Sequence, residues 1–145
     1  MIPFLNKHGW SLREDIAQDG SWRSYARVEK GDKTAILMHV EQNVPGHATA
    51  DFIRIGEWLN AIGLNAPDIY EAEDEYLLIE DFGDLSFKAA IQNGQGADQL
   101  YTLAHEVLTT LSICECPLEM PNYYESNVHK KRRWIIDYYL PTKRD

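Results

Sequence analysis

The sequence predicts an α+β fold in which a five-stranded antiparallel sheet carries one inserted helix and is followed by further helices. Three observations predict it. The chain opens with three strand-like segments separated by glycine-containing turns. A segment with helical spacing comes next, and two more strand-like segments follow it. After Gly83 the strand pattern ends and only helical patterns remain.

The first three segments predict an antiparallel meander. Strands are expected over residues 12–17, 23–29 and 34–40. A glycine-containing loop, 18–21, separates the first two strands, and Gly31-Asp32 is a hairpin turn signal between the second and third.

A single helix is expected inside the sheet. Pro45-Gly46 interrupts the strand pattern, Thr49 or Asp51 can cap a helix that runs to about Ile62, and Gly63 provides its stop. Helical spacing predicts a core-facing stripe of Phe52, Ile55, Leu59 and Ile62.

Two strands and three helices complete the predicted order. Strands are expected over 68–72 and 76–80, joined by the acidic turn 73–75. Helices are expected over 85–91, 97–114 and 126–139. Along the long helix, apolar residues lie on one side: Leu100, Leu103, Ala104, Val107, Leu108 and Leu111.

Particular residues add a family resemblance to this order. The segment Asp19-Gly20-Ser21-Trp22-Arg23-Ser24-Tyr25-Ala26-Arg27-Val28 resembles the D-A-S-F-R-R-Y-F-R-V segment of aminoglycoside-phosphotransferase-type kinases. Further matches are Ile36-Leu37-Met38, Phe52-Ile53-Arg54-Ile55-Gly56-Glu57-Trp58-Leu59, Gly63-Leu64-Asn65-Ala66-Pro67 and Leu77-Leu78-Ile79-Glu80-Asp81-Phe82-Gly83-Asp84. The resemblance covers most of residues 10–115 and extends to 134–140. It is strongest to the branch that phosphorylates N-acetylmuramate and N-acetylglucosamine.

The resemblance implies a protein-kinase-like small lobe with its hinge over residues 1–83. Residues 84–145 are then the helical start of an incomplete large lobe. It also implies ATP as the nucleotide, with magnesium, and a hydroxylated small molecule, most plausibly an amino sugar, as the acceptor. We expect self-association through apolar helix faces that the incomplete lobe leaves exposed.

The loop before the second strand is a candidate phosphate site. Gly20 and Ser21 offer unhindered backbone N–H groups and a hydroxyl. Arg23 and Arg27 can add positive charge above the phosphates. The alternative is a simple strand connection with two surface arginines.

The end of the fifth strand is the candidate hinge. The resemblance implies that the Glu80 carbonyl and the Phe82 N–H read the adenine edge, while a plain strand-end turn is the alternative. Asp81-Phe82-Gly83 also spells the magnesium-binding motif of protein kinases. We reject that assignment because no H-R-D-x-x-x-x-N catalytic loop precedes it.

Met38 stands where many kinases place a phosphate-pairing lysine. His39 and Arg27 are the nearest residues that can compensate, and the amino-sugar-kinase branch often has methionine there. Asp51 is the candidate acidic partner on the inserted helix, and Glu57 lies nearly opposite the packed stripe. The alternative is that both are surface carboxylates.

No catalytic or metal-binding residue is assigned within the chain. Phosphoryl transfer needs an aspartate at the acceptor hydroxyl, and an asparagine and a second aspartate for magnesium. In the family these lie on the large lobe, whereas only residues 141–145 follow Leu140. We therefore expect weak nucleotide binding without turnover. A fragment, a truncated frame and a non-catalytic interaction module are the open interpretations.

Composition excludes several other classes. The net charge of −9 disfavours nucleic-acid binding. Lys130-Lys131-Arg132-Arg133 is expected to be the solvated face of a helix, with contact to nucleic acid or anionic lipid as the alternative. No apolar run is long enough to cross a membrane, and we expect a cytoplasmic protein. Cys114 and Cys116 are expected to be buried or half-buried thiols.

Overall fold

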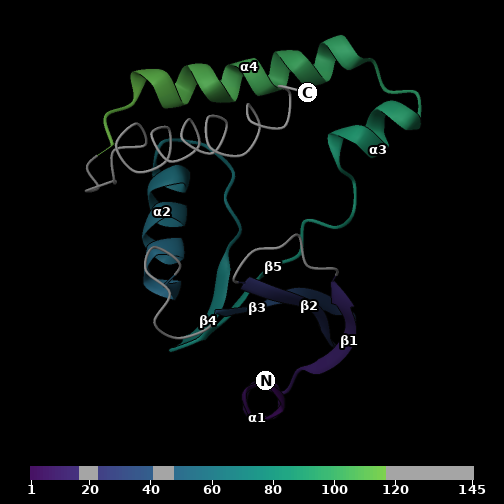
Figure 1. Cartoon of the computed structure of the whole chain (residues 1–145), viewed down its shortest axis with the longest axis vertical. Coiled ribbons are helices and arrows are strands. Elements are labelled where there is room, and N and C mark those ends of the chain that lie inside the picture. Colours follow the sequence, from purple (N-terminus) through teal and green to yellow (C-terminus); the bar gives the residue numbers. More distant parts are fainter. Residues whose placement is uncertain (17–22, 41–47, 117–145) are drawn as a thin grey trace, which may run out of the picture. The chain divides into compact units, whose positions relative to one another are not determined.

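The computed structural model describes residues 1–16, 23–40 and 48–116 of the chain. The chain divides into two compact units, Met1–Glu115 and Cys116–Asp145, and the described helices and strands all lie in the first (Figure 1). In chain order they are α1 (Ile2–His8), β1 (Ser11–Ile16), β2 (Arg23–Lys30), β3 (Lys33–Val40), α2 (Thr49–Ala61), β4 (Ile69–Glu73), β5 (Tyr76–Glu80), α3 (Phe87–Gln92) and α4 (Ala97–Ile113). The predicted helix over 126–139 and the basic run 130–133 lie outside the described residues. The predicted boundary after residue 83 stays a prediction.

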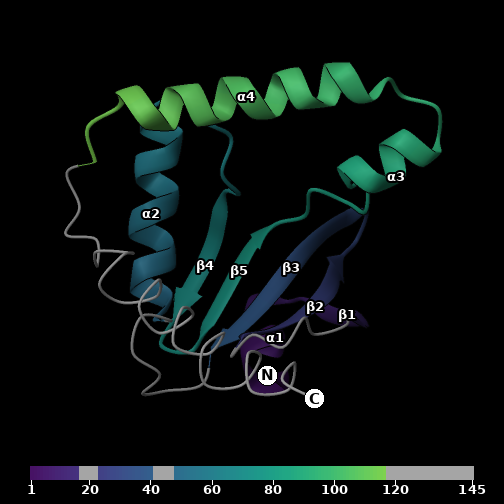
Figure 2. The ribbon, with the colours of Figure 1, turned by 45° about the horizontal axis from the view of Figure 1, so that its top comes forward.

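The five strands form one sheet in the order β1-β2-β3-β5-β4 (Figure 2). Every neighbouring pair is antiparallel. The predicted five-stranded antiparallel sheet is therefore confirmed, with α2 inserted between β3 and β4 in the chain. The predicted turn at Gly31-Asp32 joins β2 to β3, and its glycine has φ +62°, a conformation that glycine adopts without strain.

Alternation along the strands gives the sheet two apolar faces. Leu77 and Leu78 are neighbours on β5 and are both fully buried, but they belong to different core clusters. One cluster joins α1 to the sheet and consists of Phe4, Leu5, Trp10, Val28, Ala35, Leu37 and Leu78. The other consists of Met38, Val40, Leu77 and Ile79, with Phe52 and Ile53 of α2 packed against it. The two helices therefore cover opposite faces.

The predicted stripe of α2 is only partly right. Phe52 packs on the sheet as expected, but Ile53 also does, and Gly56 is the buried residue of the helix. A Cβ at Gly56 would lie 4.0 Å from the Ala66 Cβ, an ordinary van der Waals distance, so this part of the helix lies close to the segment before β4. The spacing analysis ignored glycine because glycine carries no apolar side chain.

Helix α1 was missed by the sequence analysis. It has proline in its first turn and Lys7 and His8 in its last turn. Gly9 ends it with φ +71°, and the Trp10 N–H donates to the Leu5 carbonyl at 2.9 Å. These are ordinary helix boundary signals, but a helix of seven residues is too short to show a clear apolar period.

The helices after the sheet leave large apolar side chains exposed. Leu100 is the buried residue of α4, while Tyr101, Leu103, Val107, Leu108 and Ile113 are 44–77% exposed. Cys114 is half-buried as predicted, whereas Cys116 is exposed, so that expectation was wrong for Cys116. None of the described helices combines the length and the apolar character needed to span a membrane.

Candidate functional site

The candidate hinge begins where β5 ends. Glu80 is the last residue of β5, and its N–H donates to the Asp68 carbonyl at 2.8 Å. Its side chain also accepts a hydrogen bond from the Asp68 N–H at 3.2 Å. Residues 81–85 then run to α3 without helix or strand. Phe82, in this connector, is 53% exposed. Glu80 and Phe82 thus lie at the end of β5 and just beyond it.

Arg27 of β2 is bonded to three carboxylates beside this hinge. Its Nε and Nη2 donate to the two oxygens of Asp81 at 2.8 and 3.3 Å. Its Nη1 donates to Glu14 at 2.7 Å, and its Nη2 donates to Asp84 at 2.8 Å. The hydrogen bonds that Arg27 donates to Asp84, Asp81 and Glu14 raise its pKa. One guanidinium therefore joins β1, β2 and the hinge within a locally negative cluster.

Asp81 is held by protein donors. Its side chain is 6% exposed, and it also accepts from the Gly83 N–H at 2.9 Å. Burial alone would raise the pKa of Asp81, but the hydrogen bonds from Arg27 and Gly83 outweigh burial and lower it. This arrangement agrees with rejecting Asp81-Phe82-Gly83 as a magnesium motif.

The β3 position without a lysine is closed to solvent. Met38 is 0% exposed and lies in register between Tyr25 of β2 and Leu77 of β5. His39 belongs to the other face of the sheet, because its ring stacks on Tyr76 with centroids 4.7 Å apart. His39 therefore does not replace the lysine at Met38, contrary to one expectation from the sequence.

Asp51 and Arg23 lie at the α2 side of the sheet. Asp51 is in the first turn of α2 and pairs with Arg54 of the same helix at 3.1 Å. The guanidinium carbon of Arg23 lies 5.6 Å from the Phe52 ring centroid, a distance suited to a cation–π contact. Glu57 is exposed. Asp51 is half-buried, and its role as the acidic partner stays a prediction. Arg23 links β2 to α2.

The predicted phosphate-binding loop cannot be compared with the structure. Gly20 and Ser21 lie outside the described residues. Their proposed role stays a prediction, as does the role of Arg23 and Arg27 above the phosphates. The sheet pairs Ile36 with Ile79 and Met38 with Leu77, so both lie beside the strand that ends at the candidate hinge residue Glu80.

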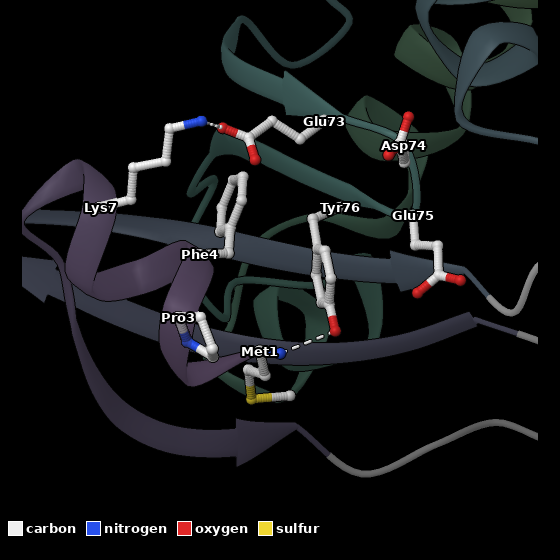
Figure 3. Close-up of a pocket in the computed structure, with 8 residues that line it drawn as sticks. All are labelled: Met1, Pro3, Phe4, Lys7, Glu73, Asp74, Glu75 and Tyr76. Carbon is white, nitrogen blue, oxygen red and sulfur yellow. Dashed lines mark hydrogen bonds and ion pairs between the residues drawn. The ribbon is translucent and has the colours of Figure 1, made fainter.

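A cavity of about 440 Å³ lies elsewhere, between α1 and the turn that joins β4 to β5 (Figure 3). It is lined by Met1, Pro3, Phe4, Lys7, Glu73, Asp74, Glu75 and Tyr76. Glu73 pairs there with Lys7 and with His8, which lower its pKa. The Met1 amine donates to the Tyr76 hydroxyl at 2.7 Å. These contacts hold α1 on the face opposite Met38, so the cavity is not part of the hinge.

The described residues contain no group of three or more His, Cys, Asp or Glu side chains arranged to hold a metal ion.

Sequence reasoning missed the cluster around Arg27. Glu14 and Arg27 are direct partners in the β1–β2 pairing, where opposite charges favour contact. The bulge between Leu12 and Glu14 shifts that register, so counting residues back from a loop does not find the pair. The paired aspartates at 81 and 84 were visible in the sequence, but their shared partner lies on a distant strand.

Comparison with known proteins gives one informative similarity. The chain is 25% identical to the N-acetylmuramate/N-acetylglucosamine kinase of Caulobacter vibrioides, over 79% of its own length. It spans 39% of the length of that kinase. No family profile matches the chain, and no solved structure matches it. The chain thus has a distant homologue among amino-sugar kinases, which supports a kinase-like relationship at a coarse level.

Proposed function

We propose that this chain is the nucleotide-binding part of an ATP- and magnesium-dependent phosphotransferase that acts on a hydroxylated small molecule of the amino-sugar class. The observation that carries the proposal is the position of the connector 81–85 directly after β5, in an antiparallel sheet with α2 inserted between β3 and β4. The similarity to an amino-sugar kinase supports the same assignment.

The adenine base is proposed to lie on the α2 face of the sheet beside the hinge. Ile36 of β3 pairs with Ile79 of β5 on this face. The neighbouring pair in the ladder is Ala35 with Glu80, the last residue of β5. Ile36 is half-buried and packs against the cluster that contains Met38. An apolar wall next to exposed backbone is the composition that a nucleobase requires, because its faces are apolar and its edge is polar.

The polar contacts are assigned to the main chain. The Glu80 carbonyl and the Phe82 N–H are proposed to bond the adenine edge, so the Phe82 side chain has little role. The phosphates are assigned to Gly20, Ser21 and Arg23. Magnesium, when bound, would neutralise phosphate charge. The resemblance implies that its ligands lie on the large lobe, so we assign none of them to a described residue.

A pair of substitutions at one residue tests the assignment. Phe82→Pro removes the N–H while Phe82→Ala keeps it, and the 53% exposure of Phe82 limits the packing lost in either variant. Magnesium-ATP at one hundred times its Kd should stabilise the wild-type chain by about 2.7 kcal/mol. Phe82→Ala should keep this stabilisation and Phe82→Pro should lose most of it.

The controls are the melting temperatures of both variants without nucleotide, which report whether they fold. Wild-type protein with the same melting temperature at all concentrations of ATP would contradict the proposed function. Equal nucleotide responses from folded Phe82→Pro and Phe82→Ala would contradict the hinge assignment.

A second function is favoured by the exposed apolar side chains of α4. Tyr101, Leu108 and Ile113 are 65–77% exposed, which is unusual for a helix that folds alone. We propose self-association of the chain through this helix as the alternative. Dimerisation that rises with concentration and is weakened by Leu108→Glu, without any effect of nucleotide on stability, would favour it over ATP binding.

A further inference from the structure

The hydrogen bonds around Arg27 restrain the hinge backbone on both sides of Phe82. Arg27 donates a hydrogen bond to each oxygen of the Asp81 carboxylate. The same Asp81 Oδ1 accepts from the Gly83 N–H at 2.9 Å, so the carboxylate bridges the residue before Phe82 and the residue after it. Gly83 has φ +74°. The Phe82 peptide is therefore fixed through Asp81, and Asp81 is fixed by Arg27.

The anchor itself is rigid and shielded. The Arg27 side chain is 12% exposed and the Asp81 side chain is 6% exposed. Arg27 lies in the middle of β2, where it pairs with Ile36 of β3 and with Glu14 of β1. A two-point contact between a guanidinium and a carboxylate fixes orientation as well as distance. The hinge is thus attached to the sheet, at a point next to Ile36.

Adenine and guanine place opposite groups at the edge that a hinge reads. Adenine offers an acceptor at N1 and a donor at its amino group, whereas guanine offers a donor at N1 and an acceptor at O6. A fixed N–H and carbonyl pair that suits adenine leaves guanine with like groups facing each other. A mobile hinge can rotate a peptide group and accept both, so discrimination depends on how firmly the backbone is held.

We propose that Arg27 is a positioning residue that, through Asp81, makes this hinge select adenine over guanine nucleotides. The inference rests on the proposed function, because it requires that a nucleotide binds at Glu80 and Phe82. It assigns Arg27 to the base end of the site, and it explains why Arg27 is surrounded by carboxylates, a setting that repels phosphate. Arg23 then remains as the β2 arginine assigned to the phosphates.

The test measures the Kd values of magnesium-ATP and magnesium-GTP for the full chain by calorimetry. Wild type should prefer ATP. Asp81→Asn should reduce the ATP-to-GTP preference about tenfold, the equivalent of one charge-assisted hydrogen bond. Arg27→Lys should reduce it as well, because lysine keeps the charge but cannot make the two-point contact. Arg13→Lys on β1 and Asp32→Asn in the exposed turn between β2 and β3 are the matched controls.

Hydrogen exchange of the Phe82 and Gly83 amides in the nucleotide-free protein provides a second readout. Exchange should accelerate at these two residues in Asp81→Asn and in Arg27→Lys, and it should not change in the controls. Asp81→Asn keeps the experiment decisive if Arg27→Lys does not fold, because asparagine retains the shape of the carboxylate.

The possible failures differ. Wild type that binds neither nucleotide overturns the proposed function and this inference together. Wild type that prefers ATP, with folded Asp81→Asn keeping the same preference, overturns this inference alone. Loss of affinity for ATP and GTP by equal factors in both variants also overturns it, since that result indicates a general structural role.

Discussion

Arg27 donates two hydrogen bonds to Asp81, a residue 54 positions later in the chain, with Nε 2.8 Å from Oδ2 and Nη2 3.3 Å from Oδ1. The contact joins a central part of β2 to the segment that leaves the sheet. The connector after β5, which is the candidate hinge, is therefore restrained by a side chain of β2 as well as by its covalent attachment to β5.

The Arg27–Asp81 contact predicts a pH-dependent stability. The pKa of Asp81 is lowered in the folded protein, so its charged form stabilises the fold. That contribution is complete above the unfolded pKa of about 3.9 and is lost as the pH falls through the lower folded value. Asp81→Asn should lower the melting temperature at pH 7, and its difference from wild type should shrink below about pH 4.

Thermal melts of wild type and Asp81→Asn from pH 7 to pH 3 check this prediction. Asp32→Asn serves as the control, because Asp32 is exposed in the turn between β2 and β3. A difference between wild type and Asp81→Asn that is constant over the whole range would contradict the account.

Met38→Lys should not recover a kinase-like ion pair. The site is 0% exposed, and the acidic partner expected from the sequence, Asp51, already pairs with Arg54. A lysine buried without a partner shifts its pKa by about three units, which costs on the order of 4 kcal/mol. Met38→Leu, a swap of similar volume, should cost less than about 1.5 kcal/mol. Urea unfolding measures both values, and a stable Met38→Lys protein would show that this face is more open than described.

Gly83 should tolerate asparagine better than alanine. Its φ of +74° lies in the left-handed region, and no atom lies within 4 Å of an added Cβ. The strain is therefore conformational and not a clash, and Gly83→Ala should lose about 1–2 kcal/mol. Asparagine enters this region more readily. Equal unfolding free energies for the two variants would contradict the assigned conformation.

Leu78→Ala should be strongly destabilising. Leu78 is fully buried in the cluster that joins α1 to the sheet, and its truncation should cost about 2–5 kcal/mol. Leu85→Ala is the control, because Leu85 is 69% exposed and should change stability by less than about 0.5 kcal/mol. Chemical denaturation of the two variants gives the comparison. Similar losses of unfolding free energy in Leu78→Ala and Leu85→Ala would contradict the assignment of Leu78 to the core.

The sheet was predictable because its signals are local. Alternating apolar residues, the Gly31-Asp32 turn and the acidic turn before Tyr76 mark the strands without any knowledge of their neighbours. Each observed strand end either agrees with the predicted one or differs from it by one residue. The inserted helix was predictable for the same reason, because the residues at its two ends carry the start and stop signals.

The contacts between distant strands were not predictable. Arg27 was expected to add positive charge above the phosphates, which stays a prediction, but its contacts with Asp81, Asp84 and Glu14 were not foreseen. His39 was expected near Met38, but adjacent residues of a strand point to opposite faces. Which partner a side chain meets depends on strand order and register, and strand order is not encoded locally.

The central claim is that a nucleotide lies on the α2 face of the sheet, beside the hinge, and methyl NMR tests it most directly. Ile36 and Ile79 belong to that face, while Leu37 and Leu78 belong to the opposite one. Titration with magnesium and a non-hydrolysable ATP analogue should shift the methyl signals of Ile36 and Ile79 saturably and leave those of Leu37 and Leu78 nearly unchanged. Saturable shifts centred on Leu37 and Leu78, or no saturable shift at any of the four residues, would contradict the claim.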